Sequence, residues 1–349
     1  VQAALDLAFD DEILGPLDEP LPSKEALGFR VPLYGVDQWK KLFAPRQQLA
    51  LAVFAKLTRK VAREMLAAGC ARELSEAVEW LLGAVFGRAA NYLSSICIWE
   101  PVAGEIKQTF LRFALPMTWD FAEANPLCAA DRYYQGGISN VAGFLERLMD
   151  SLVDVPAPSV RNHSATQHAE GTFDVVVTDP PYYDAIPYSD LMDFFYVWLR
   201  RMFHDINPAA AAAFREPLSP KWNVEKGDGE LIDESSRHGG DRRKSKAAYE
   251  DGMARAFQAC HDVLAPDGRL VIVFAHKQPD AWETLVSAII RAGFVVDGSW
   301  PIATEMRGGV RNHGRASLSS SVWLVCKKRP ETARPGWDNQ VLDEMRTKI

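Results

Sequence analysis

The sequence of 349 residues has few cysteines, and none of them is spaced for metal binding. The five lie at positions 70, 97, 128, 260 and 326, so no Cys-x-x-Cys pair occurs. We therefore expect neither a zinc ribbon, nor any other metal site, nor a disulfide framework. Isolated thiols in a reducing compartment are the simpler interpretation, and they favour a cytoplasmic protein.

Long apolar runs and an excess of positive charge are also missing. No apolar run reaches the roughly 18 to 20 residues that a membrane-spanning helix needs. The amino end also lacks the basic start and apolar core of a signal peptide. We therefore expect no contact with a membrane. The net charge is -7, so any surface for a nucleic acid must be a local patch.

The residues that are present indicate two regions of different character. Residues 1–155 are predicted to be mainly helical, with one helix beginning at Pro45 and another over about 73–95. From 156 to 330, short apolar strands alternate with helices of ordinary length. This alternation is typical of a doubly wound α/β sheet. Residues 331–349 form a tail.

Five segments of the second region are predicted to be strands. They cover 173–178, 270–274, 294–297 and 321–326, with a weaker candidate at 159–163. The strand at 173–178 is short, β-branched and apolar on both faces, which is typical of a central parallel strand. Between the strands, residues 205–246 form a long polar segment that is first acidic and then basic. Segments of that length are usually functional or disordered.

The strand at 173–178 ends abruptly at Asp179-Pro180-Pro181-Tyr182. In open α/β sheets, ligands bind beyond the carboxyl ends of the strands. The two prolines fix φ and have no amide donors, so their carbonyls remain as acceptors at a set angle. Asp179 adds a carboxylate and Tyr182 adds an aromatic face. The corner therefore suits an exocyclic amine on a flat ring.

This tetrapeptide resembles the fourth motif of the amino-methyltransferases that use S-adenosylmethionine, especially the DNA adenine-N6 methylases. Further stretches are similar to the large bacterial adenine-specific DNA methylases that carry an amino-terminal DUF1156 region and often lie beside phage-defence genes. These stretches are 33–51, 91–101, 116–126, 182–191 and 315–326, and the resemblance covers most of residues 30–330.

The resemblance implies a Rossmann-like methyltransferase sheet and S-adenosylmethionine as the cofactor. It also implies that a base is flipped out of the duplex into the corner. The amine would then be held by Asp179 and the Pro180 carbonyl, with the ring stacked on Tyr182. Corners of this kind also occur in RNA guanine-N2 methylases and protein-glutamine methylases, so the motif alone does not fix the substrate.

The chain departs from that family in one respect. A complete methylase has an Asp-Pro-Phe-Ala-Gly-Gly-Gly-like loop after its first strand, and glycine there lets the backbone approach the cofactor closely. No glycine pair of this sequence follows both a strand and an acid. Together with the start at Val1, this predicts a carboxy-terminal piece of a larger or split enzyme. An upstream segment or a second chain would supply the first strand and the loop.

The expected contacts to S-adenosylmethionine, besides Asp179, are inferred from similar positions in the family. They are Phe43 and Pro45, which resemble the motif that covers the methionine end, and Ser164 and Ala165, near the adenine ring. A plain helix start and an ordinary turn are the alternatives at these two places. Asp120 and Glu123 are candidates for the ribose hydroxyls, with capping or salt bridging as the simpler role.

The expected contacts to DNA are basic or aromatic. Arginines on a glycine-containing loop between the last two strands suit phosphate contacts and groove entry, and the basic half of the polar segment is similar in character. An aromatic side chain next to the corner suits a base. The residues are Tyr183, Arg242, Arg243, Lys244, Arg307, Arg311 and Arg315.

The leading hypothesis is an S-adenosylmethionine-dependent DNA adenine-N6 methyltransferase, or its catalytic-corner portion. One alternative is an RNA amino-methyltransferase acting on guanine N2 or adenine N6. Another is a catalytically silent DNA-binding or assembly subunit that works with other proteins of a phage-defence system. The intact Asp179-Pro180-Pro181-Tyr182 argues against silence, and the missing glycine loop argues for it.

Overall fold

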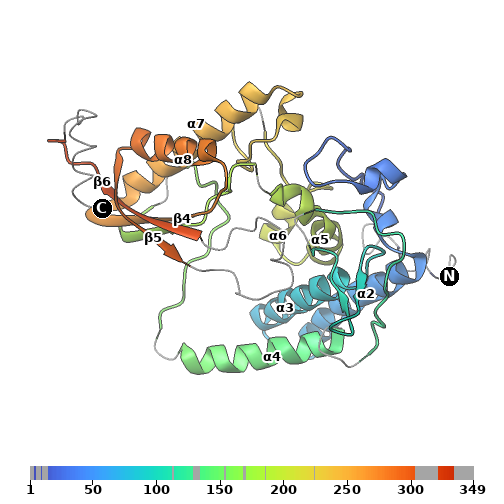
Figure 1. The fold of residues 1–349 in the computed structure, drawn as a ribbon. Helices are drawn as coiled ribbons and strands as arrows, with labels where there is room; N and C mark the ends of the chain where they lie inside the picture. Colours follow the sequence, from blue (N-terminus) through green and yellow to red (C-terminus); the bar gives the residue numbers. More distant parts are fainter. Residues whose placement is uncertain are drawn as a thin grey trace. The chain divides into compact units, whose positions relative to one another are not determined.

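The computed structural model divides the chain into two compact units (Figure 1). One unit holds Val1–Arg161 and Ile186–Asn223, and the other holds Asn162–Ala185 and Val224–Ile349. We call them unit 1 and unit 2. The structure describes residues 4, 9, 15–111, 114–128, 134–152, 155–167, 170–184, 186–223, 225–302 and 321–333.

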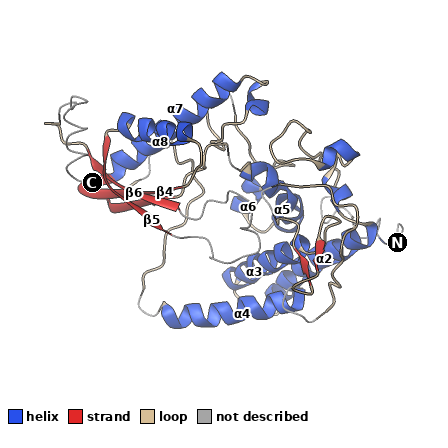
Figure 2. Cartoon of the chain, in the orientation of Figure 1, coloured by secondary structure: helices blue, strands red, loops and turns tan. Residues whose placement is uncertain are grey.

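Unit 1 is mainly helical, as the sequence predicts (Figure 2). Pro45 occupies the first turn of a helix, and the Gln47 side chain accepts a hydrogen bond from the Ala44 amide at 2.8 Å, which fixes the helix start. A short hairpin that the sequence did not predict is also present. The helices are α2 (Pro45–Ala67), α3 (Arg72–Asn91), α4 (Tyr134–Ser151), α5 (Tyr188–Phe203) and α6 (Pro208–Ala213), and the hairpin strands are β1 (Ile98–Glu100) and β2 (Glu105–Lys107).

Helix α5 belongs to the helical unit, although the sequence led us to place it in the region from 156 onward. Its apolar face carries Phe194 and Trp198, which are fully buried in the unit 1 core. The ring of Phe43 lies 5.2 Å from Phe194 and 5.7 Å from Trp198. Aromatic packing of this kind contributes a large share of core stability. The division between the units therefore follows packing rather than chain order.

Unit 2 contains a four-stranded mixed sheet with the strand order β3-β4-β6-β5. Strand β3 pairs with β4 in parallel, whereas β4 with β6 and β6 with β5 are antiparallel. Helices α7 and α8 pack beside each other and against strands of this sheet (Figure 1). The elements are β3 (Phe173–Thr178), α7 (Arg242–Val263), β4 (Leu264–Phe274), α8 (Pro279–Arg291), β5 (Phe294–Ile302) and β6 (Ser321–Lys328). The α/β class is confirmed.

Two predictions about the strands are wrong. Residues 159–163 form no strand. Strand β3 is the edge of the described sheet rather than a central strand. Val175 and Val177, which point to one face of the sheet, are 54% and 63% exposed. An apolar, β-branched strand resembles a central one in sequence, but its burial depends on a neighbour that the described residues do not provide.

The polar segment at 205–246 is more ordered than its composition suggests. It contains α6, the short 3-10 helix η4 (Ser235–His238) and the first turn of α7. Asp241 caps α7 by accepting hydrogen bonds from the amides of Arg243 and Lys244. In the described part of the chain, no helix is both long and apolar enough to cross a membrane.

Candidate functional site

The corner after β3 presents one carboxylate to solvent. Asp179 directly follows the last residue of β3 and is exposed. Its Oδ1 atom accepts a hydrogen bond of 2.7 Å from the hydroxyl of Tyr182. Of the residues that the structure describes, none donates to Oδ2. Asp179 therefore has one lone-pair-bearing oxygen that an incoming N–H group could use.

The ring of Tyr182 is held by apolar packing from the neighbouring strand. It meets Phe274, the last residue of β4, edge to face, with ring centroids 5.3 Å apart and an interplanar angle of 68°. Phe274 in turn contacts Trp282 of α8 at 5.0 Å. Because β3 and β4 are parallel, their carboxyl ends lie side by side, and Phe274 is therefore close to the corner.

A buried hydroxyl fixes the backbone of the corner. Tyr249 of α7 donates to the Pro181 carbonyl at 2.8 Å and accepts from the Tyr183 amide at 3.2 Å. Burial raises the pKa of the Tyr249 phenol well above its usual range, so it stays a neutral donor. Among the described residues, no donor is paired with the Pro180 carbonyl. That carbonyl is a second acceptor without a described donor.

Tyr183 has a strained backbone, because its φ of +58° is in the left-handed region. It is the one non-glycine residue of the described chain with a positive φ. This costs on the order of 1–2 kcal/mol. The Asp233 amide donates to its carbonyl at 3.1 Å, and its phenol bonds with the Asp233 side chain. The surrounding contacts therefore hold this conformation immediately after Tyr182.

The expected contact between Tyr183 and a base does not fit this placement. The side chain is only 7% exposed, and its ring packs edge-on against Tyr249 and His276. A flat base cannot stack on a ring whose surroundings are filled. Tyr183 supports the corner from inside, and Tyr182 is the ring that is open to solvent in part.

A hydrogen-bonded pair of His276 and Asp184 lies next to the corner. Sequence patterns alone assigned no role to His276. Its Nδ1 accepts from the Gln278 amide at 3.1 Å, so its Nε2 carries the proton and donates to Asp184 at 3.0 Å. His276 comes two residues after β4. A polar residue just past a predicted parallel strand was the signal that could have identified it.

Ser164 and Ala165 line an apolar cleft of about 390 Å³ beside β3. The Ser164 hydroxyl donates to Asp228 at 2.7 Å. The remaining walls come from the start of β3 and the end of α7, and include Val176 and Cys260. Burial raises the pKa of the Cys260 thiol to about 11, so this wall is uncharged at neutral pH. The cleft has the size and polarity that suit a flat ring.

The other expected cofactor residues have structural roles. Phe43 is buried in the unit 1 core, and Pro45 begins α2. Glu123 pairs with Arg46 through bonds of 2.8 and 2.7 Å, which confirms the simpler role for that carboxylate. Phe43 and Pro45 belong to unit 1, whereas the corner belongs to unit 2.

Only some of the residues expected to contact DNA lie in the described part of the chain. Arg242, Arg243 and Lys244 are exposed in the first turn of α7. Cations at the positive end of a helix dipole form a local point of attraction for phosphate. Three further arginines lie outside the described residues, namely Arg307, Arg311 and Arg315.

No protein-family model matches the chain, and no curated protein matches it. Within the described ranges, no group of three or more His, Cys, Asp or Glu side chains could hold a metal ion.

Proposed function

We propose that the chain carries the amine-binding corner of an S-adenosylmethionine-dependent methyltransferase, which acts on adenine N6 in DNA. The observation that carries this proposal is the pair of free acceptors, Asp179 Oδ2 and the Pro180 carbonyl, beside the partly exposed ring of Tyr182. An exocyclic amine has two N–H donors, and a purine has a face that stacks on an aromatic ring.

The acceptors account for the reactivity of a poor nucleophile. The lone pair of an aromatic amine is delocalised into the ring, and two hydrogen bonds accepted from its N–H groups favour a pyramidal nitrogen with a localised lone pair. S-adenosylmethionine supplies an electrophilic methyl group when it is bound. The chain contributes the position of the amine and the electrostatic stabilisation of the charge that develops on nitrogen. A strongly basic residue is not needed.

Support for a cofactor site comes from the cleft beside β3. Val176 lines this cleft and lies three residues before Asp179, which is about 10 Å along a strand. A flat ring that lies against Val176 would therefore be about 10 Å from the corner, a distance that the rest of S-adenosylmethionine could span. We propose that the adenine of S-adenosylmethionine occupies this cleft.

In the described sheet, β3 pairs on one side alone, with β4. This open edge supports an added strand on the other side of β3. In a Rossmann-like sheet a parallel strand of this composition is covered on both faces, and here Val175 and Val177 are exposed. We propose that an upstream segment or a second chain adds a strand along this edge and brings the glycine-rich loop with it. Addition of a strand to an open edge is a common mode of recognition.

The test is a methyl-transfer assay with the full-length gene product and labelled S-adenosylmethionine. Asp179→Ala should lower the transfer rate by about 100-fold or more, because it removes one of two acceptors aimed at the reacting nitrogen. Asp174→Ala is the matched control, since Asp174 is an exposed aspartate on the same strand away from the corner. The proposal fails if Asp179→Ala transfers methyl groups at the wild-type rate.

A further inference from the structure

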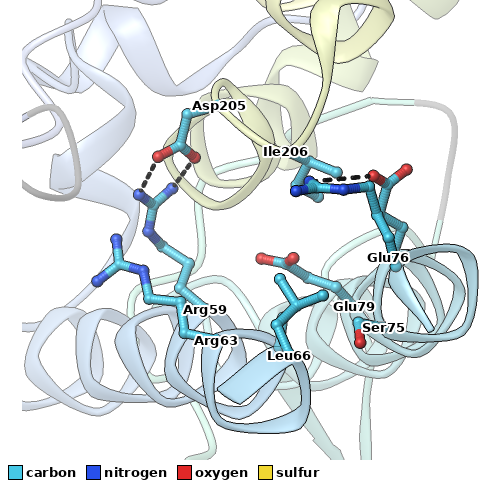
Figure 3. A pocket seen from close by; sticks show the side chains of 10 residues that line it. Arg59, Arg63, Leu66, Ser75, Glu76, Glu79, Asp205 and Ile206 are labelled. Carbon is cyan, nitrogen blue, oxygen red and sulfur yellow. Dashed lines mark hydrogen bonds and ion pairs between the residues drawn. The ribbon is translucent and has the colours of Figure 1, made fainter. Parts of the chain in front are cut away.

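Unit 1 contains a polar cleft of about 140 Å³ that the proposed function does not use (Figure 3). One water molecule needs roughly 10–15 Å³ of such volume, so the cleft has room for a small ligand. Its walls come from α2, α3 and the segment that follows α5. Arginine and carboxyl side chains form most of the lining, and Leu66 and Ile206 add an apolar wall.

Two of the three carboxyl groups in this lining already have partners. Asp205 accepts two hydrogen bonds of 2.7 Å from the fork of Arg59. Glu76 lies 3.9 Å from Arg72 and accepts a hydrogen bond of 2.9 Å from the Asn207 side chain. Neither of these two acids therefore needs a ligand to satisfy it, and the two arginines are engaged with them.

The third carboxyl group, that of Glu79, points into the cleft without a partner. Figure 3 shows the side chain projecting from α3 toward the centre of the cavity. Glu79 is only 7% exposed, and no residue of the described chain donates a hydrogen bond to it or forms an ion pair with it. A buried polar group that lacks a partner is costly, and it is a candidate for binding a ligand.

The groups around Glu79 do not provide it with a counter-ion of its own. They are Arg59 and Arg63 on α2, Arg72 and Glu76 on α3, and His204 and Asp205 just after α5. Arg63 has a further partner, and burial lowers the pKa of His204 below its ordinary value of 6.5. Burial raises the pKa of Glu79 to about 7, although the nearby charges of Arg59 and Arg63 oppose this shift.

We propose that this cleft binds a small primary ammonium ion, which donates hydrogen bonds to the ionised carboxylate of Glu79. An ammonium group has three N–H donors and no acceptor, so it matches a carboxylate that has no donor of its own. The Leu66 and Ile206 side chains leave an apolar wall for a short carbon stem. The proposal is independent of methyl transfer.

An organic cation fits the cleft better than a metal ion does. Within the described ranges, no group of three or more His, Cys, Asp or Glu side chains could hold a metal. Because Glu79 has to ionise before it can pair with an ammonium group, binding is coupled to the release of a proton near neutral pH.

Calorimetry of the full chain with butylamine tests the site. Butylamine stays protonated at pH 6 and pH 8, as the similar ammonium group of Lys does with a pKa of about 10.4. Glu79 is mostly protonated at pH 6 and mostly ionised at pH 8. We therefore expect butylammonium to bind about tenfold more tightly at pH 8 than at pH 6, with release of protons to the buffer. Tetramethylammonium, which has the charge but no N–H donor, should bind about tenfold or more weakly at pH 8.

Two variants separate this site from adventitious binding. Glu79→Gln keeps the shape of the side chain but cannot ionise. It should lower the affinity for butylammonium at pH 8 by about tenfold or more, and its remaining affinity should be the same at pH 6 and pH 8. Glu73→Gln, at an exposed position on the same helix, should behave as the wild type.

Three results would overturn the inference. The first is that butylammonium fails to bind the folded wild type at pH 8, or binds it equally at pH 6 and pH 8. The second is that tetramethylammonium binds as tightly as butylammonium. The third is that Glu79→Gln retains the wild-type affinity at pH 8.

Discussion

At the scale of single residues, Tyr249 shows how the corner is held in shape. One hydroxyl bridges the Pro181 carbonyl and the Tyr183 amide, and it is buried. Tyr249→Phe would leave both backbone groups without this partner. We expect the free energy of unfolding to fall by about 1–3 kcal/mol. The rate of methyl transfer should fall as well, because Asp179 and the Pro180 carbonyl are positioned by this backbone.

Denaturant unfolding and the transfer assay measure these two effects. Tyr34→Phe is the control, since Tyr34 is an exposed tyrosine of unit 1. Unchanged stability in Tyr249→Phe would contradict the bridging role. A loss of stability with full activity would show that the bridge is structural and does not position the acceptors.

Glu79 makes stability depend on pH in a direction that can be calculated. Burial raises its pKa to about 7 from an ordinary value of 4.5. Between these two pH values the folded chain holds the proton and the unfolded chain has lost it. The free energy of unfolding therefore falls as the pH rises from 4.5 to 7, by up to about 3 kcal/mol, and stays lower above pH 7.

The difference between wild type and Glu79→Gln isolates this effect, because His204 and the other titrating groups are common to both. Relative to the wild type, the variant should gain about 2–3 kcal/mol of stability between pH 5 and pH 8. Unfolding in denaturant, followed by tryptophan fluorescence, provides the measurement. A constant difference across this range would show that the carboxyl group is not buried as described.

At the scale of elements, the exposed edge of β3 leads to a prediction about cofactor binding. Val177→Lys puts a charge on the exposed sheet face next to the open edge, where the added segment would pack. We expect the affinity of the full-length gene product for S-adenosylmethionine to fall by about tenfold or more. The fold should be nearly unaffected, because the side chain is exposed in the described chain.

Val160→Lys, at a position that is 90% exposed outside the sheet, is the control. Equal affinities of wild type and Val177→Lys would exclude the edge as the docking place.

Elements were predictable from the sequence where their signals are local. The proline at the start of α2 and the glycine after α8, Gly293, with a φ of +81°, mark helix ends through backbone geometry alone. The identity of the edge strand was not predictable, because the position of β3 in the sheet depends on which strands pair with it. Residues 159–163 have a strand-like composition, but nothing in the described sheet pairs with them.

In the site, too, features set by adjacent residues were predictable and features set by distant residues were not. The sequence indicated Asp179 and Tyr182, because the acid, prolines and aromatic ring are adjacent along the chain. The left-handed φ of Tyr183 was not predictable, since it depends on Tyr249, 66 residues further on. The pair of His276 with Asp184 joins residues 92 apart. Contacts of this range follow from the sheet order, which composition does not specify.

At the scale of the whole molecule, the net charge of -7 confines any affinity for nucleic acid to local patches. Unit 2 holds the corner, the apolar cleft, the open strand edge and the basic first turn of α7. These features support the proposed amine-binding site and the proposal that another segment supplies the cofactor loop. They are equally available to DNA and RNA, so the nucleic acid has to be identified by the product.

The most direct measurement offers DNA and RNA together to the full-length gene product with labelled S-adenosylmethionine, and identifies the methylated nucleosides by mass. We expect N6-methyldeoxyadenosine from DNA with the wild type, and about 100-fold less, or lower still, in the same time with Asp179→Ala. Methylation confined to RNA would contradict the choice of DNA and favour an RNA amino-methyltransferase. Label in neither nucleic acid would contradict the enzyme and favour a silent subunit.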